Sequence, residues 1–483
     1  MMHRKIWLSS VVCALTLVAC DDPPAAKQTG PVQFPMVDAG TSELMDSSAP
    51  VITPPAADGS VASTTDAGAA VTPVQMDAGS APRVGPAYAA INSDWSSTSI
   101  SILDSQGKVL ADDYLNSGSA RAGLVTALSG DVELPKHSGE SGILVILDRF
   151  RTDVITRVRL SDGAILGQVK THTPPDQATT STYSSNPKDY IYIDPETAWV
   201  VRGEPNIDPM APVVDLGDDL FRINPTTMQR TSDRIDLSSL DAMTTRTDPM
   251  TGASQDVKLY ARPERMVRIG HTVVVGISRS AFDFKAVGDG AVALVDLDSK
   301  AVTSFELPGL KSCSTVDSVP NDVDTVLVTC GGDWNADSKE SAGFVLLGIQ
   351  NGGAQIEHVW RAKDDPASNP LSTDAVSLGG TLIGAAANDY SGSGPDVYAV
   401  IDLATGSKTE IKSVSPGAGV FGTPAYDADS GLLLLPDASV NKDMKPTAGL
   451  RRFQRNPDGS FSELEIVNVA ASSAMPVRHV FPL

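Results

Sequence analysis

The chain has 483 residues, a formal net charge of −22 and a sequence pI near 4.6. This acidity argues against nucleic acid and anionic lipid surfaces as partners, because both are recognised through basic patches. It fits a cation or a basic partner, or simply an exported protein that its charge keeps soluble.

The first element is a short leader. A basic stub at 1–5 precedes an apolar run from Ile6 to Ala19, which is too short to span a bilayer core of about 30 Å as a helix. This order is typical of a secretory signal. The run ends in Leu-Val-Ala-Cys at 17–20, which resembles the bacterial lipobox. The resemblance implies a signal peptide over 1–19 and a lipid bilayer as partner through acylated Cys20. We therefore expect a cell-envelope location, on the periplasmic side of either membrane or at the cell surface.

The next stretch, residues 20–85, is rich in Pro, Ala, Ser, Thr and Asp and has Phe34 as its one aromatic residue. Such a composition cannot bury enough apolar surface to offset the entropy of ordering. We predict a disordered linker here, with an end-to-end length on the order of 45 Å. The globular domain is then predicted over 86–483.

Within this domain one short hairpin pattern recurs seven times. Each copy is an apolar or alternating run, a turn of Asp, Asn, Gly, Ser or Pro, and a second alternating run. A further pair of predicted strands lies between most copies. Four antiparallel strands per unit favour a seven-bladed β-propeller, an all-β fold, over two β-sandwiches, which would not explain the recurrence. The seven turns fall near Asp104, Ser161, Asn224, Asp298, Gln350, Asp402 and Asn456.

The two ends of the domain are predicted to form one blade together. The first unit has only three predicted strands, whereas the chain ends in an unpaired apolar segment, Met475 to Leu483. We predict that this segment supplies the innermost strand of the first blade and closes the ring.

The hairpin around Val400 to Gly406, Val-Ile-Asp-Leu-Ala-Thr-Gly, resembles the YVTN-type and quinoprotein-like propeller repeats. The resemblance implies the fold more than an activity. WD40 and kelch signatures are absent, and so is the tryptophan that ends a typical quinoprotein repeat.

The cysteines predict one disulfide. Cys13 lies in the leader and Cys20 is assigned to lipid, which leaves Cys313 and Cys330. They flank a predicted turn, so they would meet on neighbouring strands, and an oxidising compartment favours their pairing. We interpret this disulfide as structural.

One face of the propeller is expected to carry the long loops, and binding residues are usually found on such loops. Three of these loops start with an acidic-aromatic pair. The pairs predict an aromatic platform for a glycan or peptide, or a repeated turn in which Asp binds backbone N–H groups. They are Asp94-Trp95, Asp333-Trp334 and Asp389-Tyr390.

The order Asp333-x-Asn335-x-Asp337 resembles the start of a calcium loop, which implies a Ca²⁺ site. Ser338 and Phe344 stand where that loop would have Gly and Glu. No other cofactor is predicted.

A second candidate site lies where the innermost strands begin, at the mouth of the central channel. Mixed charges there could bind an anion, act as acid and base, or pair as a structural ring. The residues are Asp189, Glu264, Arg265, Asp374 and Arg478. No HExxH, GxSxG or phosphate-loop motif is present.

These observations favour a monomeric, non-catalytic propeller that binds or scaffolds an envelope protein or polysaccharide. The alternative is an exported enzyme of the lactonase-like or quinoprotein-like type that acts at the central channel, a reading that rests on fold analogy alone.

Overall fold

The computed structural model describes residues 85–149, 151–173, 183–247, 250–365, 375–389, 394–417, 419–469 and 472–483. The predicted signal peptide, Cys20 and the linker up to residue 84 lie outside the described residues, as do Asp374 and Tyr390. Of the two units Met1–Met76 and Asp77–Leu483, only the second contains described residues. In the described ranges, no helix is both long enough and apolar enough to cross a membrane.

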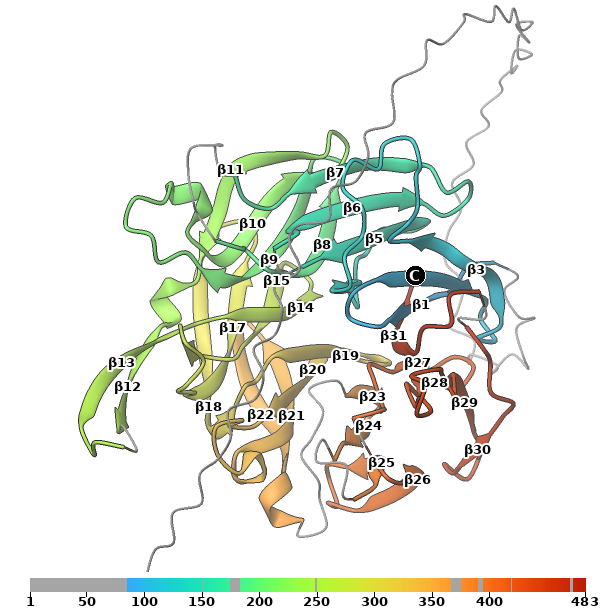
Figure 1. The fold of residues 1–483 in the computed structure, drawn as a ribbon. Coiled ribbons are helices and arrows are strands. Elements are labelled where there is room, and N and C mark those ends of the chain that lie inside the picture. The colour runs from blue at the N-terminus through green and yellow to red at the C-terminus, as the bar shows by residue number, and fades with distance from the viewer. Residues whose placement is uncertain are drawn as a thin grey trace, which may run out of the picture. The chain divides into compact units, whose positions relative to one another are not determined.

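The described residues form seven four-stranded antiparallel sheets, the blades of a β-propeller (Figure 1). The strands of each blade are given from innermost to outermost. Blade 1 consists of β31 (Val477–Pro482), β1 (Tyr88–Ser93), β2 (Thr98–Leu103) and β3 (Val109–Asn116), and blade 2 consists of β4 (Val132–Glu133), β5 (Ile143–Asp148), β6 (Val154–Arg159) and β7 (Ile165–Lys170). Blade 3 consists of β8 (Pro187–Asp194), β9 (Thr197–Pro205), β10 (Gly217–Asn224) and β11 (Gln229–Asp236). The others are blade 4, β14 (Pro263–Ile269), β15 (Thr272–Ile277), β17 (Asp289–Asp296) and β18 (Val302–Lys311); blade 5, β19 (Thr315–Val319), β20 (Asp322–Gly331), β21 (Ala342–Gln350) and β22 (Gly353–Arg361); blade 6, β23 (Val376–Gly379), β24 (Leu382–Ala387), β25 (Asp396–Asp402) and β26 (Lys408–Val414); and blade 7, β27 (Ala425–Asp427), β28 (Leu432–Pro436), β29 (Leu450–Arg455) and β30 (Phe461–Glu463).

The smaller elements lie between blades or between strands. A three-stranded sheet, which we call the arm, consists of β12 (Ala242–Thr247), β13 (Ser254–Tyr260) and β16 (Ser280–Ala281). The arm was not predicted from the sequence, although β12 alternates between exposed and partly buried residues. Four short 3₁₀ turns complete the described elements: η1 (Val213–Asp215), η2 (Ser238–Leu240), η3 (Ser338–Glu340) and η4 (Ala362–Asp364).

The seven hairpins predicted from sequence are the third and fourth strands of the seven blades. The C-terminal strand closes blade 1, because β31 pairs antiparallel with β1 and places Phe481 opposite Ala89. Figure 1 shows this red strand beside the blue one. The fold class is therefore the all-β propeller that the repeat predicts.

The apolar runs of the inner strands explain how blades pack face to face. In β5, Leu144 and Ile146 belong to the core shared with blade 1, whereas Val145 and Leu147 belong to the core shared with blade 3. Successive side chains of a strand point to opposite faces, so an unbroken apolar run serves both neighbours.

Seven apolar clusters join the blades in a closed series. Each cluster draws its buried residues from two neighbouring blades, and the last one joins blade 7 back to blade 1. One pair from each cluster is Phe481 and Leu144, Val145 and Tyr190, Trp199 and Val275, Val292 and Val328, Phe344 and Ile383, Tyr398 and Leu433, and Leu434 and Leu103.

The innermost strand of blade 2 is the exception to the regular pattern. β4 ends at Glu133, and Pro135, which has no N–H to donate, soon follows. Residues 134–138, the channel segment, then contact inner strands of other blades. The backbone oxygen of Leu134 accepts a hydrogen bond from Arg265 at 3.0 Å, and His137 Nε2 lies 2.7 Å from Asp317 Oδ1. The channel segment thus occupies the central channel.

A disulfide joins Cys313, just before β19, to Cys330 in β20, with Cα atoms 3.9 Å apart. Both sulfurs belong to residues that are fully buried in the core between blades 4 and 5. This position agrees with a structural role.

Candidate functional site

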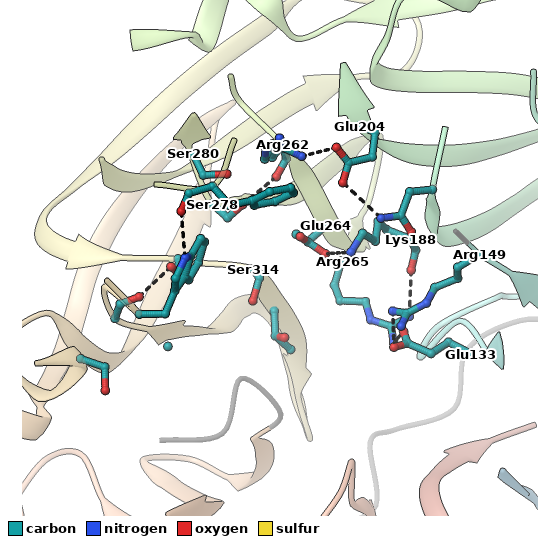
Figure 2. Close-up of a pocket in the computed structure, with 18 of the residues that line it drawn as sticks. Glu133, Arg149, Lys188, Glu204, Arg262, Glu264, Arg265, Ser278, Ser280 and Ser314 are labelled. Atoms are coloured by element: carbon teal, nitrogen blue, oxygen red, sulfur yellow. Dashed lines mark hydrogen bonds and ion pairs between the residues drawn. The ribbon is translucent and has the colours of Figure 1, made fainter. Parts of the chain in front are cut away.

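A cavity of about 670 Å³ opens where the inner strands of blades 2 to 5 begin. Figure 2 shows charged side chains from several blades pointing into it. We call it the mouth pocket. Its wall combines ion pairs, hydroxyl groups and two aromatic rings. Its lining includes Glu133, Arg149, Asn186, Lys188, Glu204, Arg262, Glu264, Arg265, Ser280, Phe284, Ser312 and Trp334.

Three residues of the pocket lining that precede inner strands have a left-handed backbone conformation. Asn186, Arg262 and Ser312 come shortly before β8, β14 and β19, and their φ angles are 48°, 48° and 53°. Non-glycine residues seldom adopt this conformation, so something must hold it.

Buried aspartates at the start of third strands hold two of these turns. Asp153 Oδ1 accepts the backbone N–H of Asn186 at 2.7 Å, and Asp218 Oδ1 accepts that of Arg262 at 2.6 Å. Asp396 makes the same kind of bond to Val420, at 2.8 Å. Each aspartate therefore clamps its own blade to the first residues of the next one.

Glu133 is a charged group of the mouth pocket that two guanidinium groups hold. Its carboxylate pairs with the guanidinium groups of Arg149 and Arg265, and Arg265 also donates to the backbone oxygen of Lys188 at 2.9 Å. Burial alone would raise the pKa of Glu133, but the two guanidinium groups lower it well below its usual range. Glu133 is therefore an ionised, fixed part of the wall.

In a second ion pair, Arg262 and Glu204, the guanidinium group also has several partners within the protein. Arg262 donates to the Glu204 carboxylate and to the backbone oxygens of Ala281 and Phe282, both at 3.3 Å. Its guanidinium also lies over the ring of Phe284, 4.0 Å from the centroid.

The third pair, Lys188 and Glu264, differs from the other two. The Lys188 Nζ atom lies 3.0 Å from Glu264 Oε2, and the two side chains are 17% and 25% exposed. Among the described residues each of these two groups has the other as its one close polar partner. An ammonium has three N–H donors and a carboxylate about four acceptor positions, so both groups keep capacity that faces the mouth pocket.

The sequence-predicted channel residues divide between two places. Glu264 and Arg265 line the mouth pocket. Asp189 is buried, and its carboxylate accepts the backbone N–H of Met266 at 2.8 Å, so it joins two inner strands instead of facing the cavity. Burial raises its pKa. Arg478 donates to the backbone oxygen of Ser93 and lies outside the pocket lining.

The acidic-aromatic pairs also divide. Trp334 lines the mouth pocket, whereas Trp95 lies near Arg478, whose guanidinium is 5.2 Å from the ring centroid. The three aspartates bind backbone N–H groups of their own loops, in the manner of the turn interpretation. These bonds run from Ser96 to Asp94, from Asn335 to Asp333 and from Gly394 to Asp389.

The residues of the suggested calcium loop are engaged elsewhere. Lys311 Nζ lies 2.9 Å from Asp333 Oδ2, where the cation would sit, and the amide of Asn335 donates to Phe284 at 3.0 Å. Asp337 caps the η3 turn. No group of three or more His, Cys, Asp or Glu side chains in the described ranges could hold a metal ion. The geometry therefore offers no support for calcium here.

Sequence reasoning missed Glu133, Arg149, Glu204 and Arg262 as parts of this site. The clamp aspartates left a faint signal, because Asp-Val-Ile at 153–155 and Asp-Val-Tyr at 396–398 open the third strands of two blades. Two of the contacts, Glu133 with Arg265 and Glu204 with Arg262, join different blades, which a repeat pattern does not specify.

No protein-family profile and no curated protein sequence matches the chain. Among solved structures, it is similar to the periplasmic gluconolactonase of Pseudomonas aeruginosa, with 12% identity, a TM-score of 0.49, and coverage of 82% of this chain and 99% of that one. A candidate 6-phosphogluconolactonase from Bacteroides fragilis has 11% identity, a TM-score of 0.49, and coverage of 83% and 98%. A Lactobacillus plantarum protein has 11% identity, a TM-score of 0.48, and coverage of 83% and 100%. Such distant likenesses do not bear on activity, and the fold rests on the strand pairing of this chain.

Proposed function

We propose that the protein is an exported, lipid-anchored propeller enzyme that hydrolyses an ester or lactone bond of a small, uncharged, hydroxyl-rich molecule in the mouth pocket. The observation that carries the proposal is the Lys188 and Glu264 pair, which faces the cavity with spare donors and acceptors. The anchor at Cys20 and the envelope location come from the sequence alone.

The pair supplies the two groups that ester hydrolysis needs. The Glu264 carboxylate takes a proton from water as the water oxygen bonds to the carbonyl carbon. The Lys188 ammonium donates a hydrogen bond to the oxygen that becomes negative. When the carbon-oxygen ester bond breaks, the proton on Glu264 passes to the leaving oxygen, and both residues return to their starting state.

The charge balance of the mouth pocket points to an uncharged substrate. Each of its four cations already has a carboxylate partner. Arg149 pairs with Asp131 and Glu133, and Arg265 also pairs with Glu133. Lys188 pairs with Glu264, and Arg262 pairs with Glu204. An anionic ligand would therefore find no unbalanced positive charge in this lining, whereas hydroxyl groups can use the donor and acceptor positions that remain.

The test is hydrolysis of glucono-1,5-lactone, a small uncharged cyclic ester, followed with a pH indicator above the spontaneous rate. We expect the wild type to accelerate the reaction and Glu264→Gln to lower kcat by at least about 100-fold, the usual contribution of a general base. The matched control is Glu306→Gln, which removes a carboxylate paired with Arg279 outside the pocket lining and should leave kcat unchanged. Equal rates for Glu264→Gln and the wild type would refute the assignment.

A second candidate function is binding without turnover, in which the spare donors and acceptors of Lys188 and Glu264 hold the ligand but do not activate water. In that case the lactone would bind in the pocket, and the wild type would not exceed the spontaneous rate.

A further inference from the structure

Four aromatic side chains lead from the mouth pocket to the arm: Trp334 and Phe284 line the pocket, and Phe282, two residues before Phe284, contacts Tyr260 of the arm. Trp334 and Phe284 line the pocket and are 49% and 44% exposed. Phe282 is 47% exposed, and its ring centroid lies 6.4 Å from that of Tyr260 in an edge-to-face arrangement. We call these four residues the aromatic row.

The pocket end of the aromatic row is held rigidly. The indole N–H of Trp334 donates to the backbone oxygen of Phe284 at 3.1 Å, and Asn335 donates to the same oxygen at 3.0 Å. Phe284 has a φ of 59°, an uncommon conformation for a bulky residue. Backbone strain of this kind gathers at ligand-binding sites. These bonds fix the backbone of Phe284, and the Arg262 guanidinium, 4.0 Å from the ring centroid, packs over its ring.

The arm end of the row is tied to the pocket wall by the small sheet. Tyr260 pairs in register with Ser280, which itself lines the mouth pocket. The Lys258 ammonium lies 4.6 Å from the Tyr260 ring centroid and 2.8 Å from Asp241. The arm end of the row is thus joined to the pocket wall through the pairing of β13 with β16.

Charged pairs border the row closely. Lys258 pairs with Asp241, and Arg246 pairs with Asp283 at 2.7 Å. Rings set among balanced charges suit a ligand whose units each have an apolar face and a hydroxylated edge, as sugar rings do. A protein partner would need an interface of at least about 1,000 Å² with an apolar centre, which such a narrow row does not offer.

We infer that the mouth pocket takes the end of an uncharged oligosaccharide and that the aromatic row binds the following sugar units. This inference rests on the proposed function, because it extends the substrate of the same pocket from a single unit to a chain.

The test measures dissociation constants for cello- and malto-oligosaccharides of one to six units, by calorimetry on the wild type and on Phe282→Ala/Tyr260→Ala. We expect affinity to rise about tenfold between one and four units in at least one series, as about 1.4 kcal/mol of added contact would give. The double variant should bind the single unit as the wild type does and lose the rise with length. Trp95→Ala, which removes an exposed tryptophan outside the row, should keep the rise.

The outcomes separate the two proposals. Turnover of the lactone with no effect of length, or a rise that survives in the double variant, overturns the aromatic row as a binding surface and leaves the pocket assignment intact. No turnover and no binding of any sugar, including the single unit, overturns the proposed function and the inference with it.

Discussion

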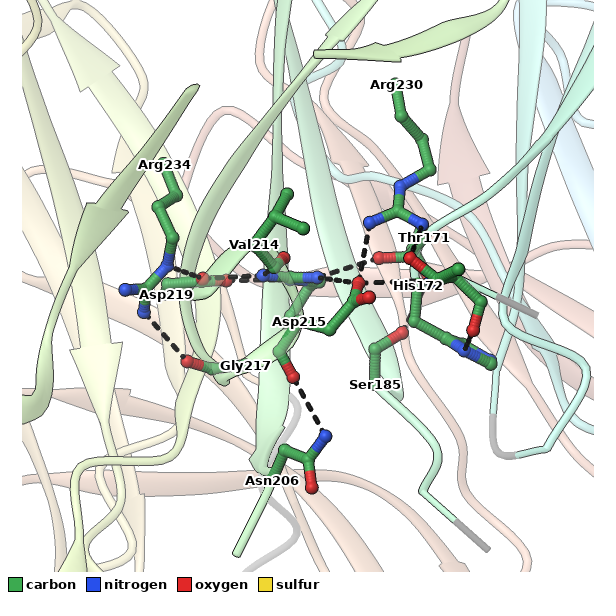
Figure 3. A network of polar contacts seen from close by, with 12 residues as sticks. Thr171, His172, Ser185, Asn206, Val214, Asp215, Gly217, Asp219, Arg230 and Arg234 are labelled. Carbon is green, nitrogen blue, oxygen red and sulfur yellow. Dashed lines mark hydrogen bonds and ion pairs between the residues drawn. The ribbon is translucent and has the colours of Figure 1, made fainter. Parts of the chain in front are cut away.

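Blade 3 contains one charged cluster, built on Arg202, Asp219 and Arg234, and one side of a second, Lys188 with Glu264 of blade 4; the two use similar residues in different surroundings. In its middle strands, Arg202 donates to Asp219 and to the backbone oxygen of Thr171, and both Arg202 and Asp219 are 0% exposed. Figure 3 labels Asp219 and Thr171. At its inner edge, Lys188 and Glu264 form the partly exposed pair of the mouth pocket (Figure 2).

The two clusters differ in how many of their hydrogen-bond donors and acceptors have partners within the protein. The Arg202 guanidinium donates to both oxygens of Asp219, at 2.7 and 2.6 Å, and to two backbone oxygens. Arg234 adds a further bond to Asp219 at 2.6 Å. That network is satisfied within the protein, whereas the Lys188 and Glu264 pair is not. Unused bonding capacity beside a cavity, and not charge itself, distinguishes the candidate functional cluster from the structural one.

The largest expected effect is on stability at the structural cluster. Asp219→Asn removes the nearer of the two carboxylates paired with the buried Arg202 and leaves Asp215 at 3.8 Å, so we expect the free energy of unfolding to fall by about 3–5 kcal/mol. Glu264→Gln, at a partly exposed pair, should change it by less than about 1 kcal/mol. Urea denaturation of both variants measures these changes in the free energy of unfolding. Similar decreases for the two variants would contradict the distinction between the clusters.

An intermediate effect is expected on the pH dependence of stability. Burial, with Asp241 nearby, raises the pKa of Asp218 from its usual acidic range to about 8. Because the folded protein holds this proton more tightly than the unfolded chain does, the contribution is present at acidic pH. It is lost as pH rises from about 4 through about 8.

Asp218→Asn removes this titration, so its stability should change less between pH 5 and pH 8 than that of the wild type, as followed by thermal unfolding across buffers. Asp153→Asn is the matched control, since Asp153 forms the corresponding clamp on Asn186. Parallel pH profiles for the wild type and Asp218→Asn would contradict the account of Asp218.

The smallest effect is expected on the far side of the channel mouth. Arg478 contacts Ser93 and the Trp95 ring and lies outside the mouth pocket. Arg478→Ala should therefore leave lactone hydrolysis unchanged in the same indicator assay. A loss as large as that of Glu264→Gln would mean that the functional site extends beyond the pocket.

The sequence was sufficient for the fold because the signals for blades are local. Hairpin turns and alternating runs specify strands three and four, and the apolar C-terminal segment matches the missing strand of blade 1. The channel segment was not foreseen, since nothing near Pro135 indicates that the chain leaves its sheet for the channel.

The site was foreseen only in part because its contacts join distant residues. Arg265 and Glu133 are 132 positions apart, and Glu264 and Arg265 were identified from their place at the start of a strand alone. The same rule wrongly put Asp189 in the cavity, because side chains alternate along a strand and its carboxylate binds the backbone of β14.

The most direct measurement is a crystal structure of the Glu264→Gln variant soaked with glucono-1,5-lactone. The account predicts the lactone ring in the mouth pocket, with its carbonyl oxygen within hydrogen-bond distance of Lys188 Nζ and its ring facing Trp334. A ligand bound elsewhere, or a mouth pocket that stays empty at concentrations that saturate wild-type turnover, would contradict it.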